Sequence, residues 1–381
     1  MSIQCPKFTA PKERIITQIN TLQELLKNGH SLENCTIQAL NLEPLQLNWK
    51  NFTFGNTLFL GCSLGLEEEI VLRRHGAGVY QSPTGLPYDP FRTQLYAWQE
   101  LLEAAADQTI YDYFSNSRFN PTINEALWQR IHDHAIDDAL RQLLKFDDYG
   151  MTHKKCVAIM GGHGVHRTDP YFHKVVLTAK LLGENGFFIA SGGGPGIMEA
   201  ANLGAYLAGQ PHAAVEQALA LLVPAPHYTH PGYHETALAV LEKFPDGQDN
   251  LAIPTWFYGH EPSNLFASHI AKYFSNSIRE DTLLAIALYG TIYAPGSAGT
   301  TQEIFMDAAQ NHYATFNYFS PMVFLGRQRY EIDTILYPLL RQLSHGKPYH
   351  DLLHLTDEPH EILHFLQHHG PVKKTIEGPD N

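Results

Sequence analysis

The residues best suited to chemistry lie in one stretch, 294–303, which reads Ala-Pro-Gly-Ser-Ala-Gly-Thr-Thr-Gln-Glu. It follows a short apolar run at 290–293 and opens a helical pattern, so we predict a strand, a glycine-rich turn and then a helix. Such a turn presents backbone N–H groups beside the positive end of a helix dipole, which favours an anion and most often a phosphate. Glu303 would then place a carboxylate in the first helical turn, next to a phosphorylated ligand.

A second turn of the same kind lies upstream, at 191–196, and reads Ser-Gly-Gly-Gly-Pro-Gly. It follows an apolar run at 187–190 and precedes a helical pattern at 197–207. Ligands of open α/β sheets bind at the carboxyl ends of the strands, where both turns would lie. The sequence therefore predicts two backbone cradles for one nucleotide.

Arg279 is predicted to flank the same crevice as Glu303. Ser277 has the character of an N-cap for a helix over 278–288, which puts Arg279 in the first turn of that helix. The helices of a doubly wound sheet begin at the carboxyl edge of the strands, and the helix of Glu303 begins at that same edge. A cation in a first turn opposes the helix dipole by roughly 0.3–1 kcal/mol, so an anionic ligand or a Glu partner would rationalise Arg279.

These motifs resemble those of the LOG (Lonely-guy) family, which was once mislabelled as lysine decarboxylases. The block 295–303 is similar to the family's Pro-Gly-Gly-x-Gly-Thr-x-x-Glu signature, and 191–196 is similar to its other glycine turn. Asn-Ser-Ile-Arg-Glu at 276–280, followed by 294–300, resembles the longer bacterial branch, the pyrimidine/purine nucleotide 5′-monophosphate nucleosidases. The resemblance spans about 150–345 and implies a Rossmann-like enzyme. Its expected reaction is hydrolysis of the N-glycosidic bond of nucleoside 5′-monophosphates to free base and ribose 5-phosphate.

Two residues depart from the pattern of the short-chain members. Ser297 stands where they have a second Gly, and Glu280 stands where they have Lys after the Arg. The reversed charge at Glu280 disfavours cytokinin-type substrates more than it disfavours nucleotide hydrolysis, because the longer branch shows a similar Arg-Glu pair.

The resemblance also implies roles for particular residues. Glu303 would stabilise the positive ribosyl state at C1′ or activate the attacking water, and Arg279 would hold the ligand or stabilise charge on the departing base. The N–H groups expected to hold the 5′-phosphate belong to Gly193, Gly194, Gly299, Thr300 and Thr301. The full set of expected nucleotide-binding residues is Gly162, Gly192, Gly193, Gly194, Gly196, Gly296, Ser297, Gly299, Thr300 and Thr301. The reaction needs no metal or redox cofactor, and family members are homodimers or larger.

Other readings of the same residues stay open. Thr300-x-x-Glu303 and Ser277-x-x-Glu280 both match a capping box, in which the carboxylate returns to the start of its own helix. We expect this role for Glu280, whereas for Glu303 the local sequence is neutral and the resemblance favours catalysis. A non-catalytic nucleotide or cofactor carrier is the alternative function. An oxidoreductase is disfavoured because the turn 161–164 does not fit the G-x-G-x-x-G fingerprint of dinucleotide-binding folds.

The composition of the chain disfavours several other classes of protein. The formal net charge is −13 over 381 residues, and no run of Lys and Arg offers a patch for nucleic acid. The four cysteines lack C-x-x-C spacing, which argues against a disulfide framework or a zinc ribbon. We see no signal peptide and no apolar run of membrane-spanning length, so a cytoplasmic protein without a membrane partner is expected.

Histidines are numerous, at 22, and two groups could serve a site. His227, His230 and His234 could bind a metal, although a polar loop lining the substrate is favoured. In the turn after the strand at 157–160 we read His166 as a turn residue and leave the role of His163 open.

Alternating strands and helices from residue 150 predict a Rossmann-like, doubly wound parallel sheet with an appended N-terminal α/β module. The expected domains are 1–150, of unknown role, 151–345, the catalytic domain, and 346–381, a helix at 361–367 with a polar tail. The expected strands are 157–160, 187–190, 218–223, 290–294 and 322–325. The expected helices lie near 171–184, 197–208, 264–275, 278–288 and 301–313. The apolar helix at 265–274 could serve as an interface in a homo-oligomer.

Overall fold

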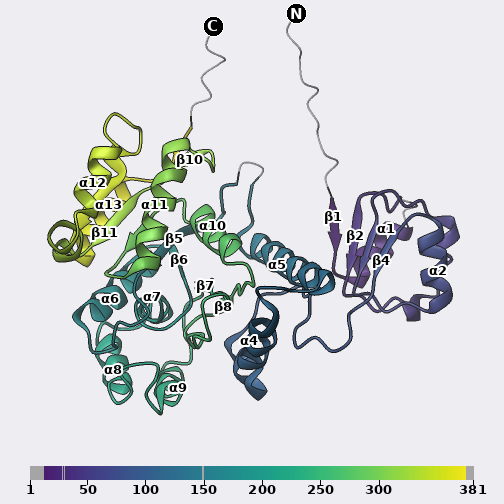
Figure 1. Cartoon of the computed structure of the whole chain (residues 1–381), viewed down its shortest axis with the longest axis horizontal. Helices are drawn as coiled ribbons and strands as arrows, with labels where there is room; N and C mark the ends of the chain where they lie inside the picture. Colours follow the sequence, from purple (N-terminus) through teal and green to yellow (C-terminus); the bar gives the residue numbers. More distant parts are fainter. Residues whose placement is uncertain (1–12, 28, 30, 148–149, 375–381) are drawn as a thin grey trace, which may run out of the picture. The chain divides into compact units, whose positions relative to one another are not determined.

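The computed structural model describes residues 13–27, 29, 31–147 and 150–374. They form two compact units, one made of the residues up to Gln94 with Asn124–Ala135, and one made of Leu95–Ile123 with the residues from Ile136 onward. The helix α5 (Ile123–Leu144), labelled in Figure 1, has residues assigned to both units.

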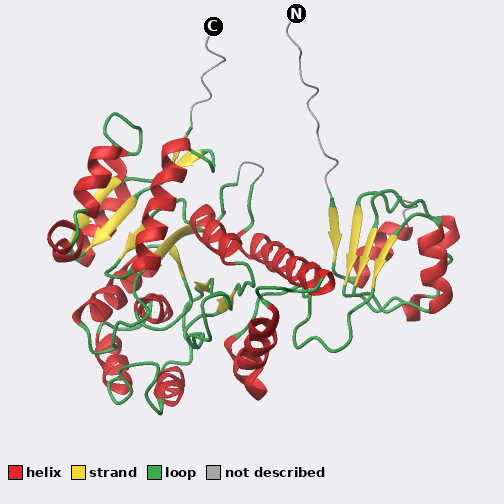
Figure 2. Cartoon of the chain, in the orientation of Figure 1, coloured by secondary structure: helices red, strands yellow, loops and turns green. Residues whose placement is uncertain are grey.

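The larger unit is built on a seven-stranded sheet in which all neighbouring strands run parallel (Figure 2). The order is β12-β11-β9-β5-β6-β7-β8. The strands are β5 (Lys155–Met160), β6 (Phe187–Ser191), β7 (Leu251–Ala252), β8 (His269–Ile270), β9 (Thr291–Tyr293), β11 (Met322–Leu325) and β12 (Leu353–Thr356). The strand order, with β5 at the centre, confirms the Rossmann-like α/β class.

Helices separate most of these strands in the chain and cover the sheet. They are α6 (Pro170–Glu184), α7 (Ile197–Tyr206), α8 (Ala213–Leu222), α9 (Tyr233–Lys243), α10 (Asn276–Ile286), α11 (Ala298–Tyr313), α12 (Leu336–Leu343) and α13 (Pro359–His368). A short antiparallel pair, β10 (Tyr318–Phe319) with β13 (Val372–Lys373), lies outside the main sheet. Within the described residues, none of the helices combines the length and the apolar character that crossing a membrane requires.

The central strands are buried on both faces, since β5 is buried from Cys156 to Met160 and β6 along its whole length, as expected for a parallel sheet with helices on each side. On one face, Val157, Ile159, Ile189 and Ile292 belong to a core cluster with the inward faces of α6 and α7. This core holds the carboxyl ends of the strands at one edge, and the turns of interest follow those ends.

The smaller unit has its own four-stranded parallel sheet in the order β1-β2-β3-β4. The elements are β1 (Arg14–Ile16), α1 (Ile19–Lys27), β2 (Cys35–Gln38), β3 (Leu58–Leu60), α2 (Leu66–Arg74) and β4 (Gly78–Tyr80). A separate core around Trp49 and Phe59 fills it. An α/β module therefore precedes the larger unit, as the sequence predicted, and its role stays a prediction.

Two element predictions were wrong. The run 218–223 is not a strand but the end of α8, whose buried residues Ala214, Val215, Ala218 and Leu222 follow a helical period. The segment 264–275 is not a helix: it contains β8 and is buried almost throughout, which imitates an apolar helix in sequence. The interface that we predicted on a helix at 265–274 is therefore not present in that form.

Three strands of the main sheet escaped the sequence analysis. β7 and β8 are only two residues long, too short to show a period, and Pro254 follows soon after β7. β12 lies in the segment 346–381, for which we expected only a helix and a polar tail. The expected helix there is confirmed as α13, and residues 375–381 lie outside the described part of the chain.

A buried carboxyl joins α11 to β9 beneath the edge where the turns lie. Asp307 accepts hydrogen bonds from the Tyr293 hydroxyl at 2.8 Å and from Asn311 Nδ2 at 3.0 Å. Burial raises the pKa of Asp307 to about 7, although hydrogen bonds from Tyr293 and Thr291 lower it. A folded-state pKa above the unfolded value means that the folded protein holds this proton more tightly. The stability that Asp307 contributes is therefore complete below about pH 4 and is lost as the pH rises to about 7.

We expect Asp307→Asn to remove this dependence, because an amide imitates the protonated carboxyl. Between pH 4 and pH 8, the free energy of unfolding of the variant should gain on that of the unmodified protein by up to about 4 kcal/mol. Urea unfolding at a series of pH values measures the difference. Parallel pH curves for the two proteins would show that Asp307 has an ordinary pKa.

Candidate functional site

The glycine turns meet at one cavity of about 540 Å³, the large cavity, at the carboxyl edge of the main sheet. It is lined by the segments that follow β5, β6, β7 and β9, together with side chains from α7, α10 and α11. The chain leaves β5 toward β6 on one side, and β9 pairs with β5 on the other. The two halves of the sheet therefore diverge at this point, which is where doubly wound sheets open a crevice for ligands.

Most of the predicted site residues come together here. Arg279 and Glu303 both line the large cavity, as do Gly162, Gly192, Gly194, Ser297, Gly299 and Thr300. Four predicted residues do not line it, namely Gly193, Gly196, Gly296 and Thr301. Thus the turns at 191–196 and 295–301, distant in sequence, face a common space with the turn that contains Gly162.

Two of the glycines outside the lining allow these turns to pack against each other. Gly196 has a φ of +68°, and a Cβ there would lie 2.4 Å from the carbonyl oxygen of Gly162. A Cβ on Gly296 would lie 2.1 Å from Thr300 Oγ1 in its own turn and 3.0 Å from the backbone nitrogen of Gly162 in the neighbouring turn. Their contribution is thus close backbone approach rather than direct contact with a ligand.

The structure corrects which N–H groups can hold an anion. The N–H of Gly193 donates to Ser191 Oγ at 3.0 Å, and that of Thr301 donates to the Ser297 carbonyl at 3.1 Å. Because α11 begins at Ala298, its first three N–H groups have no carbonyl one turn earlier. These belong to Ala298, Gly299 and Thr300, and Ala298 was not among the predicted residues.

Arg279 and Glu303 form a buried ion pair at the side of the large cavity. Arg279 Nη1 lies 3.0 Å from Glu303 Oε1, and Arg279 Nε donates to the Ile253 carbonyl at 2.8 Å. The side chains are only 9% and 12% exposed, so water screens the pair weakly. Gly192 makes room for the guanidinium, because a Cβ there would lie 2.4 Å from Arg279 Nη2.

Glu303 does not cap its helix. Since α11 begins at Ala298, Glu303 is in the second turn and its carboxylate turns to Arg279. The prediction that it lies in the first turn was therefore wrong by one turn. Glu303 lines the large cavity, and its catalytic role stays a prediction. Burial raises the pKa of Glu303, and Arg279 opposes that rise. The carboxyl is thus desolvated and held by a cation, which suits a group that exchanges protons or faces a developing positive charge.

The capping role predicted for Glu280 is also wrong. The helix α10 begins at Asn276 with Ser275 as its N-cap, so Ser277 is already inside it. Glu280 Oε1 instead accepts from Asn276 Nδ2 at 2.7 Å and from the Tyr258 hydroxyl at 3.4 Å, and Oε2 accepts from Gln302 Nε2 at 2.8 Å. Glu280 thus organises a small polar network on the wall of the large cavity.

Several cavity residues escaped the sequence analysis. They are Met160, Gly161, Met198, Pro254, Thr255, Tyr258, Gly259, Glu261, Ala298 and Gln302. Five of them, from Pro254 to Glu261, follow β7, and because that strand was not recognised nothing placed its loop at the carboxyl edge. Recognition of Leu-Ala-Ile-Pro at 251–254 as a short strand ending in proline was the available signal.

The structure places three of the histidines that the sequence analysis considered. His163 lines the large cavity with its Nδ1 3.6 Å from Glu261 Oε1. His227 packs against the rings of His166 and Tyr228, with centroid distances of 5.0 and 4.4 Å. Within the described chain no group of three or more His, Cys, Asp or Glu side chains is arranged to hold a metal ion.

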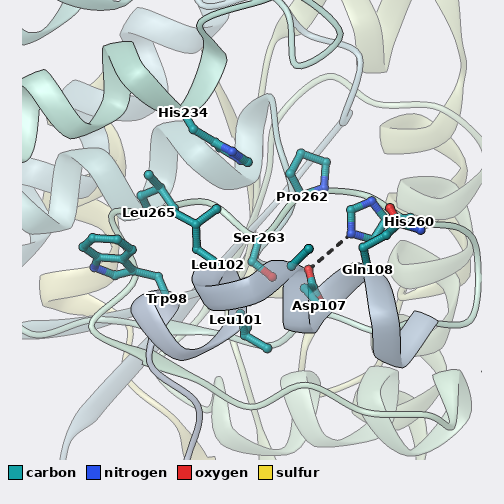
Figure 3. A pocket seen from close by; sticks show the side chains of 11 residues that line it. Trp98, Leu101, Leu102, Asp107, Gln108, His234, His260, Pro262, Ser263 and Leu265 are labelled. Atoms are coloured by element: carbon teal, nitrogen blue, oxygen red, sulfur yellow. Dashed lines mark ion pairs between the residues drawn. The ribbon is translucent and has the colours of Figure 1, made fainter. Parts of the chain in front are cut away.

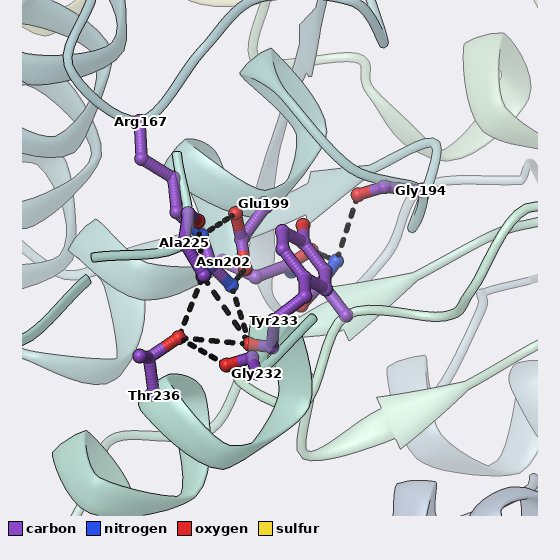
Figure 4. A network of polar contacts seen from close by, with 9 residues as sticks. Arg167, Gly194, Glu199, Asn202, Ala225, Gly232, Tyr233 and Thr236 are labelled. Atoms are coloured by element: carbon purple, nitrogen blue, oxygen red, sulfur yellow. Dashed lines mark hydrogen bonds and ion pairs between the residues drawn. The ribbon is translucent and has the colours of Figure 1, made fainter. Parts of the chain in front are cut away.

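A buried network holds the glycine turn from below (Figure 4). Asn202 Oδ1 accepts from Ser191 Oγ at 2.6 Å and from Asn264 Nδ2 at 2.8 Å. Asn264 also donates its backbone N–H to the Gly193 carbonyl at 3.1 Å. On the same helix as Asn202, Glu199 pairs with Arg167, which donates onward to the Ala225 carbonyl at 3.0 Å and to Thr236 Oγ1 at 2.9 Å. These two sets of contacts share α7: one fixes it to the glycine turn and the other to the start of α9.

Comparison with known proteins yields structural likenesses only. No protein-family model matches the sequence, and no curated protein matches it. The structure is similar to the molybdenum cofactor binding protein from the phototrophic bacterium Rippkaea orientalis, with 14% identity, a TM-score of 0.37, and coverage of 57% of this chain and 97% of that one. It is also similar to the Moco carrier protein from Chlamydomonas reinhardtii, with 14% identity, a TM-score of 0.35 and the same coverage.

Proposed function

We propose that this protein hydrolyses the N-glycosidic bond of nucleoside 5′-monophosphates. The observation that carries the proposal is the buried Arg279–Glu303 pair beside a cavity rimmed by three glycine-containing turns. A cavity of about 540 Å³ is within the range of small-molecule sites, and its volume suits one mononucleotide.

The phosphate would lie at the start of α11. There the free N–H groups of Ala298, Gly299 and Thr300 and the positive end of the helix dipole favour a dianion. The turn at 191–196 would close over the ligand from the other side, with Gly192 and Gly194 at the surface of the cavity. No metal is required to hold the phosphate in this arrangement.

Glu303 would act at the sugar. The bond between C1′ and the base nitrogen breaks as a bond from C1′ to a water oxygen forms. The carboxylate stabilises the positive charge on the ribosyl group and accepts the proton of the water, which passes to the departing base. Arg279 would orient the carboxylate and, through Nη2, donate to the ligand. The products are a free base and ribose 5-phosphate.

The test is a panel of AMP, GMP, CMP and UMP incubated with the protein, with free base measured by chromatography. We expect at least one nucleotide to release its base together with an equal amount of ribose 5-phosphate. If folded protein releases no base from any of them, the enzymatic proposal is wrong.

The alternative is a non-catalytic protein that binds or carries a nucleotide or cofactor. The two similar structures are named as a molybdenum cofactor binding protein and a Moco carrier protein. One observation favours it: Glu303 is already paired with Arg279, so the carboxylate could serve only to fix the guanidinium. Calorimetry separates the two, because a carrier would bind a member of the panel without turnover.

A further inference from the structure

A second cavity, the small cavity, of about 190 Å³ lies in the larger unit behind the loop that follows β7 (Figure 3). This loop is a wall shared by both cavities. Tyr258, Gly259 and Glu261 line the large cavity, whereas His260, Pro262 and Ser263 line the small one. The opposite wall comes from α3 (Trp98–Leu102) and the beginning of α4 (Ala106–Ser117).

Most of this lining is apolar, with Trp98, Leu101, Leu102, Pro262 and Leu265 forming the walls. The body of an occupant must therefore be apolar too, since a polar surface would lose its hydrogen bonds with water and gain none.

The backbone between α3 and α4 is strained where it borders the small cavity. Ala104 and Ala105 both have positive φ, 48° and 54°, although neither is glycine. A residue with a Cβ is strained at positive φ, and strain of this kind clusters at ligand sites and switch regions. The two strained residues lie between α3 and α4, and Ala105 lines the small cavity.

One polar atom of the small cavity has no partner. His234 Nε2 is buried and makes no hydrogen bond, and Figure 3 shows its ring directed into the cavity. A buried imidazole nitrogen without a hydrogen-bond partner destabilises the unliganded protein, so a ligand that supplies the partner is favoured. His260 Nε2, in contrast, lies 3.6 Å from Asp107 Oδ2, and Figure 3 marks this ion pair with a dashed line.

The small cavity offers no unbalanced formal charge. Lys272 Nζ donates to both oxygens of Asp107, at 2.7 and 2.9 Å, and Trp256 Nε1 donates to the same carboxylate at 2.8 Å. Although burial opposes ionisation, the pairing with Lys272 and the hydrogen bonds lower the pKa of Asp107 to about 2. Asp107 and Lys272 therefore both stay ionised, and their opposite charges cancel. An ionic ligand would leave its own charge uncompensated.

We propose that the small cavity binds a neutral, single-ring molecule that carries one hydrogen-bonding group for His234. The size is appropriate, because an apolar cavity of about 150 Å³ accommodates benzene. The unpartnered Nε2 of His234 selects a ring with a hydroxyl, carbonyl or ring nitrogen over a plain hydrocarbon. This site is separate from the proposed catalytic function and does not depend on it.

Calorimetry with phenol, uracil, benzene and benzoate tests the chemistry. We expect phenol or uracil to bind more tightly than benzene, and benzoate to bind at least tenfold more weakly than phenol. Equal binding of benzoate and phenol would overturn the requirement for a neutral ligand.

Three variants test the location. His234→Phe keeps a ring and removes the nitrogen, so it should weaken phenol or uracil by about threefold to tenfold and leave benzene unchanged. Leu102→Trp should fill the small cavity and abolish binding of all probes. Leu238→Trp is the matched control, since Leu238 is 37% exposed and Leu102 39%, and Leu238 is outside the lining. Full phenol binding by Leu102→Trp would show that the probe does not occupy this cavity, and no change in His234→Phe would contradict the role of the imidazole.

Discussion

Glu303→Gln is expected to lower the rate of base release from nucleoside monophosphates by about 10²–10⁴-fold, the usual contribution of a positioned acid–base group. The amide keeps the size of the side chain but cannot accept the proton of the water or balance a positive ribosyl group. The rate is measured with the nucleotide that performs best in the panel. Because the phosphate would bind at the start of α11, the affinity for ribose 5-phosphate should stay within about threefold of that of the unmodified protein.

The control for Glu303→Gln is Glu216→Gln, which changes an exposed carboxylate that pairs with His173. It should release base at the unmodified rate. Full activity of Glu303→Gln would remove Glu303 from the mechanism. Loss of ribose 5-phosphate binding along with activity would instead mean that the substitution had damaged the cavity.

Glu199→Gln is expected to lower the free energy of unfolding of the larger unit by about 3–5 kcal/mol, because it leaves a guanidinium buried without its counter-ion. Both side chains of the Arg167–Glu199 pair are only 1% exposed, and the ring of Tyr233 lies 3.7 Å from the guanidinium carbon. Since Arg167 also holds the Ala225 carbonyl and Thr236, the loss should extend to the start of α9.

Urea unfolding measures this loss, and Glu216→Gln again serves as the control. Its side chain is 65% exposed, so the ion pair with His173 is well solvated and its removal should change stability by less than about 0.5 kcal/mol. Equal effects of the two substitutions would show that the buried pair contributes no more than a surface pair.

Much of the architecture could be predicted from the sequence, because long apolar runs and glycine turns act locally. The run at 322–325 was located to the residue as β11, and the two turns needed only their own glycines to be recognised. The elements that were not predicted depend on contacts made only in the folded protein. β7 exists because Leu251 and Ala252 pair between β6 and β8, and two residues alone carry no period.

The candidate site shows the same division. The convergence of Arg279 and Glu303 followed from the direction of helices in a doubly wound sheet. The hydrogen-bond partners of individual side-chain and backbone atoms could not be predicted from the sequence. The local sequence of Glu280 fits a capping box, yet Tyr258 and Gln302, brought close only by folding, claim its oxygens. The N–H of Gly193 already donates to the Ser191 hydroxyl oxygen, two residues away.

The lining of the large cavity runs in the chain from Met160 to Glu303 and draws on both halves of the sheet. No shorter piece of the chain carries the complete lining, so occupancy and the native state of this unit are thermodynamically linked. A molecule that recognises only the native form raises the unfolding free energy by RT ln(1 + [L]/Kd), about 2.7 kcal/mol at a hundredfold excess over Kd. A melting curve thereby becomes a sensor of cavity occupancy that requires no knowledge of the reaction.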